Sequence, residues 1–397
     1  MPDACTVTGD PTSGNRSAVT VSLACAFAVL AITHCTTDHT RRGYLRTLAA
    51  TYAAPPSHPV VIVAGFGVTR LLDPVRNRYA WGTAHATVQR RFDDDLDLPI
   101  DDDGNIGRDR LVPRGYVGSR GPINIGWQLE EGLRKFGGYV PGRDVYPFHY
   151  DWRLSARHNA QTLADFIERI RRGGRVDVIT HSAGSLVALT YVKLAGGGDK
   201  VEHLVLIAPA RSGVIDAFRV VVRPERFIRR VFTPEMVSTW PSVPELLPDD
   251  GRFIVDERGR AIDFDAWKAE DWTRFIALDA QHRRAFARSL DNARRLRAEL
   301  RDTPLPAGVK LTVIAGDCVE TAGRVIARAD GSFVFYPGEL RPEEKMLERT
   351  LFELGDGTVP VSSATASPSP VLLLFCDGHQ GLAADPNVHR ALLRILR

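Results

Sequence analysis

The chain has 397 residues, with 51 lysines and arginines against 48 aspartates and glutamates, which gives a net charge of +3 at pH 7. A balance this close to zero argues against a dedicated nucleic-acid binder, since such proteins usually carry a strongly basic domain or stripe. Five cysteines in so long a chain exclude a disulfide scaffold, and no CxxC or HExxH spacing indicates zinc. We therefore expect a globular protein of ordinary enzyme size.

The amino-terminal part of the chain is apolar. Residues 17–33 contain no charged side chain, which predicts an export or anchoring segment within residues 1–35, followed by a linker at 36–58. Cys35 suggests lipid attachment, although a bulky histidine precedes it. The run is shorter than the about 20 apolar residues that span a membrane. We expect secretion or attachment to the cell envelope, or a cytoplasmic protein if this segment is not an export signal.

Six short apolar runs, rich in β-branched residues, predict strands that are buried on both faces. They lie at residues 59–64, 145–150, 175–180, 201–208, 310–315 and 371–376. Helical patterns occur between or after several of them, at 159–172, 185–194 and 386–396. This alternation predicts an α/β fold with a mostly parallel sheet and helices on both of its faces.

The strand pattern stops between residues 209 and 304, which predicts a helical cap inserted into a core formed by 59–208 and 305–397. Within the cap, residues 215–232 alternate apolar side chains with five arginines. Apolar residues that insert into lipid and arginines that meet phosphates are the two components of interfacial binding. The alternative is a cap helix that packs on the sheet and leaves its arginines in water.

A nucleophile motif follows the run at 175–180. Residues 180–184 read Thr-His-Ser-Ala-Gly and lead into the predicted helix at 185–194. A serine at the turn between a strand and a helix forms a nucleophile elbow, and the amino end of the helix favours a developing anion. We expect Ser182 to be the nucleophile. Alternation along the strand turns His181 away from Ser182, which predicts a structural role for His181.

A base for Ser182 must come from a histidine later in the chain, because this fold carries its triad in the order serine, acid, histidine. His379 directly follows the run at 371–376, at the carboxyl edge where ligand sites of open α/β sheets gather. The other histidines after Ser182 are His203, His282 and His389. We expect His379 to be the base.

Two aspartates are candidates for the acid that orients this histidine. Asp356 lies in residues 355–360, which read Gly-Asp-Gly-Thr-Val-Pro, a tight loop that can fix a carboxylate. Asp317 follows the run at 310–315, a common place for the third member of a triad. We prefer Asp356, and Asp317 stays the alternative.

An oxyanion hole needs backbone N–H donors from two segments. One donor is that of Ala183, the residue after the nucleophile, and the other comes from the loop after the first predicted strand. Residues 64–68 read Ala-Gly-Phe-Gly-Val, so the N–H of Phe66 is the best candidate. A dinucleotide fingerprint would need glycine or alanine in place of Arg70, and no GxxxxGK[ST] occurs. We expect no nucleotide, cofactor or metal.

Four segments together resemble the lecithin:cholesterol acyltransferase family, which includes lysosomal phospholipase A2 and the phospholipid:diacylglycerol acyltransferases. They are Tyr-Pro-Phe-His-Tyr-Asp-Trp-Arg at 146–153, the serine motif at 180–184, the aspartate loop at 355–360 and Gly-His at 378–379. The resemblance runs from about residue 59 to the carboxyl end. It implies an α/β-hydrolase fold with a cap, an acyl-enzyme mechanism on glycerolipids, and Ser182, Asp356 and His379 as the catalytic triad.

These residues lead us to expect a serine acyl-hydrolase or acyltransferase that acts on glycerolipid (phospholipid) esters at a membrane or lipoprotein surface. One alternative is a carboxylesterase or lipase of the same fold that acts on other esters. A second alternative is a non-catalytic lipid-binding protein, which would leave the complete triad unexplained.

Two cysteines lie at or just past the ends of late predicted strands. If these strands are neighbours and the compartment is oxidising, Cys318 and Cys376 form a disulfide. Two buried free thiols are the alternative.

Overall fold

The computed structural model describes residues 56–83, 96–118, 125–227, 230–367 and 369–397. The chain divides into two units, 1–51 and 52–397, and all described residues belong to the second. The expected export segment at 1–35 and most of the expected linker lie outside the described residues. Within the described part of the chain, no helix has the length and apolar character needed to cross a membrane.

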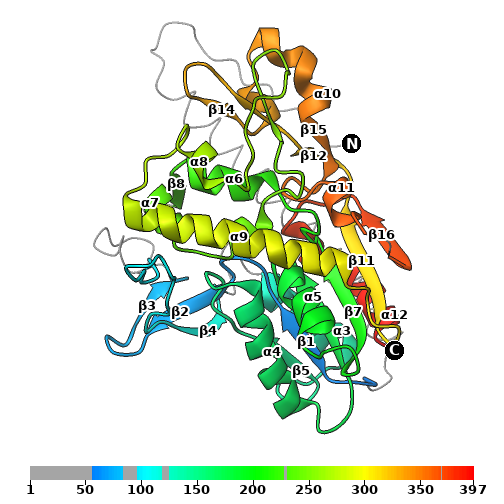
Figure 1. Ribbon diagram of the computed structural model, residues 1–397. Helices are drawn as coiled ribbons and strands as arrows, with labels where there is room; N and C mark the ends of the chain where they lie inside the picture. The colour runs from blue at the N-terminus through cyan, green and yellow to red at the C-terminus, as the bar shows by residue number, and fades with distance from the viewer. Residues whose placement is uncertain (1–55, 84–95, 119–124, 228–229, 368) are drawn as a thin grey trace, which may run out of the picture. The chain divides into compact units, whose positions relative to one another are not determined.

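A six-stranded parallel sheet forms the centre of the second unit (Figure 1). Neighbouring strands are parallel in all five pairs. In order across the sheet, the strands are β16 (Val371–Phe375), β11 (Lys310–Gly316), β7 (Val201–Ile207), β6 (Val176–His181), β1 (Val60–Val63) and β5 (Val145–Phe148). Each strand overlaps one of the six predicted runs, so the predicted α/β fold with a mostly parallel sheet is confirmed.

Helices cover both faces of this sheet. Alternate residues of a strand point to opposite faces, so Val60 and Ile62 join one hydrophobic cluster, whereas Val61 and Val63 join another. The first cluster includes side chains of α3 (Ile125–Gly137) and α12 (Pro386–Ile395). The second includes side chains of α4 (Ala156–Ile170) and α5 (Gly184–Leu194).

Capping residues in the sequence mark where two of these helices begin. The side chain of Ser155 caps α4 by accepting a hydrogen bond from the backbone N–H of His158. At α12, Asp385 accepts from the N–H groups of residues 387 and 388, and Pro386 occupies the first turn, where its missing N–H costs nothing.

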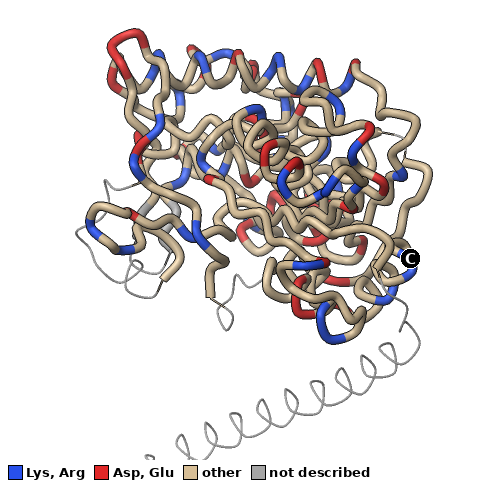
Figure 2. The backbone as a smooth tube through the Cα atoms, turned by 90° about the horizontal axis from the view of Figure 1, so that it is seen from below, with Lys and Arg blue, Asp and Glu red and all other residues tan. Residues whose placement is uncertain are grey.

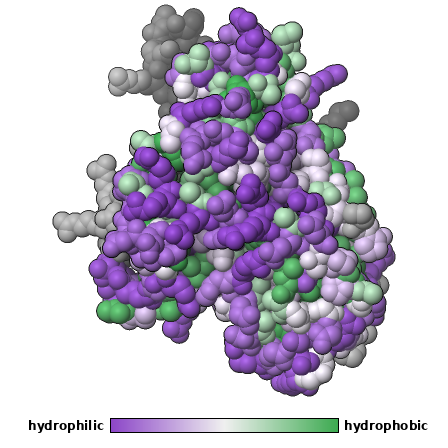
Figure 3. Space-filling view, in the orientation of Figure 1, coloured by the Kyte–Doolittle hydropathy of each residue, from purple (hydrophilic) through white to green (hydrophobic). Residues whose placement is uncertain are grey.

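The inserted residues 209–304 form a separate layer of short elements and one long helix, α9 (Ala280–Asp302). The others are α6 (Ile215–Val222), β8 (Glu225–Phe227), β9 (Arg230–Phe232), α7 (Pro234–Ser238), η2 (Pro244–Leu246), β10 (Ile254–Val255) and α8 (Ala269–Trp272). Figure 1 shows α9 between the sheet with α4 and α5 on one side and α6, α7 and α8 on the other. Figure 2 shows basic and acidic residues interspersed along the chain, and the face in view in Figure 3, which has the orientation of Figure 1, is mainly hydrophilic.

Three apolar residues of α6, Ile215, Phe218 and Val221, face inward, as the alternative of a packed cap helix expected, whereas the side chains of residues 225–231 lie outside the described part of the chain. Phe218 is 0% exposed and contacts an aromatic cluster. The rings of this cluster belong to Phe253, Phe264, Trp272, Phe275, Phe333 and Phe335. Ile215, Val221 and Phe232 are buried as well. The helical spacing of residues 215, 218 and 221 places them on one face, and that face packs into the protein.

Residues 317–360 form a second segment outside the central sheet. The sequence pattern predicts that they belong to the core formed by 59–208 and 305–397. It contains β12 (Val319–Ala322), β13 (Val325–Ala327), β14 (Phe333–Val334), η3 (Pro337–Glu339), η4 (Pro342–Leu347), α10 (Glu348–Leu351) and β15 (Phe352–Gly355). β12 pairs with β15, and β13 pairs with β10 of the inserted layer. A third small sheet joins β2 (Thr69–Asp73), β3 (Arg78–Trp81) and β4 (Val112–Tyr116). The remaining short helices are α11 (Val361–Ala364) and η5 (Gly381–Ala383).

Candidate active site

Ser182 lies at the sharp turn between β6 and α5 with a φ of +54°, a conformation that side chains other than glycine rarely adopt. The turn is held by the N–H of Ser182, which donates to the carbonyl of Ile207 over 2.9 Å. A Cβ on Gly184 would lie 2.3 Å from the carbonyl oxygen of Val63, so α5 can begin this close to β1 only with glycine. The backbone therefore presents the Ser182 hydroxyl in a fixed, strained elbow.

Thr180, which stands where glycine is commonest in such motifs, is accommodated by a partner. Its hydroxyl lies 2.7 Å from that of Ser185 in the first turn of α5, and both side chains are buried. The pair satisfies two buried polar groups where the strand and the helix come together.

His379 follows β16, the outermost strand of the sheet, and its ring contacts Ser182, which follows β6. Its Nε2 lies 2.9 Å from Ser182 Oγ, and its Nδ1 lies 2.8 Å from Asp356 Oδ2. The backbone N–H of His379 also donates to the carbonyl of Asp356 over 2.8 Å. The His379 side chain is 15% exposed and that of Asp356 only 1%, so solvent reaches the edge of the ring while the carboxylate stays buried.

The loop around Asp356 holds its carboxylate in place. Oδ1 accepts hydrogen bonds from the N–H groups of Thr358 and Val359, at 2.9 and 2.7 Å. Burial alone would raise the pKa of Asp356, but the electrostatic interaction and hydrogen bond with His379 and these two N–H donors outweigh it and lower the pKa. Asp356 is therefore ionised, His379 donates through Nδ1, and Nε2 is left to accept the proton of Ser182.

The alternative acid, Asp317, has a different environment. The N–H of Asp317 donates to the carbonyl of Phe375, and within the described part of the chain no hydrogen bond joins the Asp317 carboxylate to His379. A Cβ on Gly316 would lie 2.6 Å from Asp356 Cβ. Asp356 thus occupies the space at the end of β11 that the alternative acid was expected to use.

Three histidines after Ser182 have other partners. Nδ1 of His203 lies 2.9 Å from Asp177 and that of His282 lies 2.9 Å from Asp279. His389 is buried, with Nε2 3.0 Å from the carbonyl of Ala383.

His181 contacts the backbone of His379, although its position on the strand turns it away from Ser182. Its Nε2 lies 2.8 Å from the carbonyl oxygen of His379, and the two rings are 4.7 Å apart. Burial and the neighbouring charge of His379 lower the pKa of His181 to about 3. The ring is therefore neutral and donates through Nε2 to the loop that carries His379. No signal in the sequence pairs these two residues, because the contact depends on how β16 lies relative to β6.

The residues predicted for the oxyanion hole flank Ser182. A Cβ on Gly65 would lie 2.9 Å from Ser182 Cβ, so the loop after β1 directly contacts the elbow. Phe66 follows Gly65 and Ala183 follows Ser182, so both residues lie next to this contact, and no backbone carbonyl in the described part of the chain occupies their N–H groups.

Aromatic side chains fix this loop. The hydroxyl of Tyr150 donates to the carbonyl of Ala64 over 2.7 Å, and the indole of Trp81 donates to that of Gly67 over 2.7 Å. Arg153, the last residue of the segment 146–153, is fully buried. It donates to the carboxylates of Asp151 and Asp109 and to the carbonyl of Leu96. The segment 146–153, which was singled out by resemblance, thus supports the loop that carries Phe66.

Phe66 and Ala183 line a narrow, mainly apolar cleft that also includes a few polar side chains. Its other lining residues are Tyr150, Trp152, Leu154, Ala156, Asn159, Leu186, Val187, Ser242, Glu245 and Leu246. Glu245 is buried, and burial raises its pKa to about 8 even though the N–H of Ala156 donates to it over 2.7 Å. No motif in the sequence marks this residue, which is a single carboxyl inside the inserted segment.

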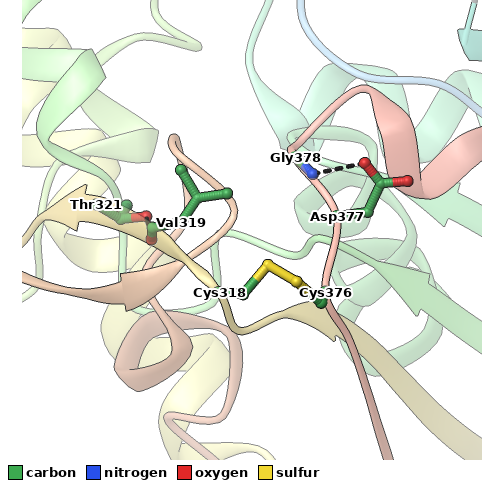
Figure 4. The surroundings of a disulfide bond; sticks show 6 residues. All are labelled: Cys318, Val319, Thr321, Cys376, Asp377 and Gly378. Carbon is green, nitrogen blue, oxygen red and sulfur yellow. Dashed lines mark hydrogen bonds between the residues drawn. A yellow bond between two sulfur atoms is a disulfide. The ribbon is translucent and has the colours of Figure 1, made fainter. Parts of the chain in front are cut away.

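Cys318 and Cys376 form a disulfide, as one of the two sequence-based interpretations predicted (Figure 4). Cys376 precedes Asp377, Gly378 and His379. Cys318 begins the segment that carries Thr321, whose hydroxyl accepts a hydrogen bond from the N–H of Gly357 over 2.8 Å. The disulfide therefore joins the two segments that position His379 and the Asp356 loop.

Residues 114–392 match the model of the alpha/beta hydrolase family. Among curated proteins, the uncharacterized protein YJR098C of Saccharomyces cerevisiae is 27% identical over 248 residues, which cover 59% of this chain and 36% of the yeast protein. The chain thus spans about a third of the length of this curated relative.

Comparison with solved structures shows the same fold in one case. The Tle4–Tli4 complex contains a chain with a TM-score of 0.59 and 16% identity, and the match covers 85% of this chain and 97% of that one. The phospholipase PlaB from Legionella pneumophila has a TM-score of 0.42 and 14% identity, with coverage of 85% and 59%. By the family match over most of its length, this chain belongs to the alpha/beta hydrolase family.

Proposed function

We propose that this protein is a serine hydrolase that cleaves carboxylic esters through an acyl-enzyme on Ser182. The observation that carries the proposal is the continuous hydrogen-bond chain from Ser182 Oγ through His379 to the Asp356 carboxylate. A serine hydroxyl becomes a useful nucleophile only when a base of this kind can take its proton.

The geometry supports a two-step reaction. Ser182 Oγ attacks the ester carbonyl while its proton moves to His379 Nε2, and Asp356 stabilises the imidazolium that forms. On this proposal, the N–H groups of Phe66 and Ala183 bind the oxyanion. His379 then returns the proton to the leaving alcohol, and a second nucleophile, activated by the same histidine, releases the acyl group.

We further propose that the acyl donor is a glycerolipid, as the resemblance to the lecithin:cholesterol acyltransferase family implies. The segments that carry the resemblance include the triad loops, which are joined by the bond between His379 and Asp356. They also include residues 146–153, in which Tyr150 donates to Ala64 in the loop before Phe66. On this proposal the second nucleophile is water or a lipid alcohol, and the protein works at a lipid surface after export. A carboxylesterase on soluble esters is the competing proposal, favoured by the inward-facing apolar residues of α6.

Incubation with phosphatidylcholine vesicles, with and without a sterol or diacylglycerol, tests these proposals when the products are identified by mass. Free fatty acid indicates hydrolysis, and a new ester of the added alcohol indicates transfer. Cleavage of a short soluble ester without attack on the vesicles supports the carboxylesterase. Binding of vesicles without any ester cleavage would support the non-catalytic alternative.

A fluorophosphonate probe tests the nucleophile independently of the substrate. We expect it to label Ser182, and Ser182→Ala should abolish labelling and lower turnover by several orders of magnitude. Undiminished labelling of the alanine variant would contradict the assignment.

A further inference from the structure

A second cluster of functional side chains lies at the opposite edge of the sheet from Ser182. His58 stands two residues before β1, Asp177 is the second residue of β6, and His203 is the third residue of β7. The three strands are parallel neighbours, so their amino ends meet at one edge and the candidate active site lies at the other. The cluster is therefore separate from the proposed ester chemistry.

The three side chains present their donor atoms to one another. One ligand atom of each lies within 4.8 Å of the others. Nδ1 of His203 is 2.9 Å from Asp177 Oδ1, and Nδ1 of His58 is 3.8 Å from Asp177 Oδ2. Among the described residues, no other group of three or more histidine, cysteine or carboxylate side chains lies this close together.

An irregularity in the sheet directs His203 toward the cluster. Val176 pairs with Val201, but Val178 pairs with Leu204. Two residues of β7 therefore stand opposite Asp177 alone, which is the pattern of a β-bulge. The bulge lets both the backbone N–H and Nδ1 of His203 approach Asp177 Oδ1, at 3.1 and 2.9 Å.

Two polar atoms of the cluster lack hydrogen bonds. The Asp177 side chain is 0% exposed, and its Oδ2 has no hydrogen-bond partner in the described structure. The buried Nδ1 of His58, which faces this oxygen, has none either. Leaving a buried carboxylate oxygen without a partner is costly. A cation between Oδ2 and the two imidazoles would satisfy both atoms.

We propose that His58, Asp177 and His203 form a Zn²⁺ site. Two imidazoles and one carboxylate suit Zn²⁺ and related transition metals, whereas Ca²⁺ and Mg²⁺ prefer oxygen ligands alone. The ion takes the place of the proton that His203 shares with Asp177. His58 and His203 remain 29% and 17% exposed, which leaves a path for the ion and room for a water as fourth ligand.

Charges near the cluster are compatible with a cation. Arg175 and Lys310 lie at the same edge, but both pair with Glu202, at 2.6 and 2.7 Å. The bound ion would join the amino ends of three core strands, so its expected effect is on stability and not on ester cleavage. No zinc spacing exists in the sequence because the three ligands come from three separate strands.

The test uses the full chain after treatment with EDTA and dialysis. We expect it to bind one equivalent of Zn²⁺ in calorimetry, and to raise its Tm by several degrees at saturating Zn²⁺, because an ion that binds only the folded state stabilises it. Co²⁺ in place of Zn²⁺ should give a visible absorption band from the imidazole and carboxylate ligands.

Variants assign the ion to this cluster. His58→Gln and His203→Gln should each weaken Zn²⁺ binding at least tenfold and reduce the Tm response, while fluorophosphonate labelling of Ser182 stays unchanged. His282→Gln is the matched control, because His282 makes the same N–H and Nδ1 contacts to Asp279 but lacks a second imidazole. Circular dichroism checks that each variant is folded. Absence of Zn²⁺ binding, or equal binding by the double variant His58→Gln/His203→Gln, would overturn the proposal.

Discussion

The choice between two aspartates depends on which carboxylate meets His379 Nδ1. Asp356 makes that contact at 2.8 Å, and Asp317 does not. We expect Asp356→Asn to preserve the fold but to leave the imidazole in the wrong tautomer, and so to lower kcat on the order of 10⁴-fold. Asp317→Asn should change kcat little. Measurement of kcat for both variants on one soluble ester checks this, and the reverse ranking would reassign the acid.

His181 acts through the backbone of His379. In His181→Phe the carbonyl of His379 loses its donor, and the loss of a buried hydrogen bond costs about 1–3 kcal/mol. If this energy is used to hold the base in place, kcat should fall about 10- to 100-fold with little change in KM. His282→Gln provides a control on a distant histidine. A fall in stability with unchanged kcat would show that the role of His181 is purely structural.

Residues with a local signature could be predicted from the sequence, and residues defined by tertiary contacts could not. Ser182, His379 and Asp356 each stand in a short motif next to a strand, and the structure brings the three together. The bond from His181 to His379 and the burial of Glu245 join segments far apart in the chain. No periodicity or spacing encodes such contacts.

At the scale of secondary-structure elements, fully buried strands could be predicted from the sequence, and short, partly exposed strands could not. β1 and β6 are fully buried and β-branched, so their runs were recognisable. The strands of the second segment outside the central sheet have two to four residues and mix polar with apolar positions, as in β12 and β15. Such short strands give neither a continuous run nor a clear alternation, which explains why residues 317–360 were assigned to the core.

The disulfide links the segments that follow β11 and β16, which leads to a prediction about both stability and activity. Its 58-residue separation corresponds to about 4 kcal/mol in the chain-entropy account. We expect Cys318→Ser/Cys376→Ser to lower the free energy of unfolding by up to this amount. It should also reduce kcat, because the freed segments carry Thr321 and His379.

Urea unfolding and ester assays of the double variant check this prediction. Thiol counting in denaturant without reductant provides the control on the wild-type protein. The chain has five cysteines, so the bonded pair leaves at most three free thiols. Five free thiols in protein from an oxidising compartment would contradict the bond.

At the scale of the whole molecule, the buried carboxyl of Glu245 couples stability to pH. Burial raises its pKa from 4.5 to about 8 in the folded protein, against the opposing effects of the Ala156 N–H and of Arg157 and Arg297. The folded state therefore keeps a proton that the unfolded state has lost between these two pH values. By linkage, the stabilisation is fully present below pH 4.5 and is lost as pH rises to about 8.

Replacement of Glu245 by glutamine should remove this pH dependence. The glutamine is neutral at every pH, and its oxygen can still accept the hydrogen bond from the Ala156 N–H. Between pH 5 and pH 8.5 we expect the free energy of unfolding of the wild type to fall relative to that of Glu245→Gln, by an amount on the order of a few kcal/mol. Urea unfolding of both proteins at the two pH values measures the difference. Parallel pH profiles would mean that Glu245 is already ionised in the folded state, with Arg157 and Arg297 compensating its charge.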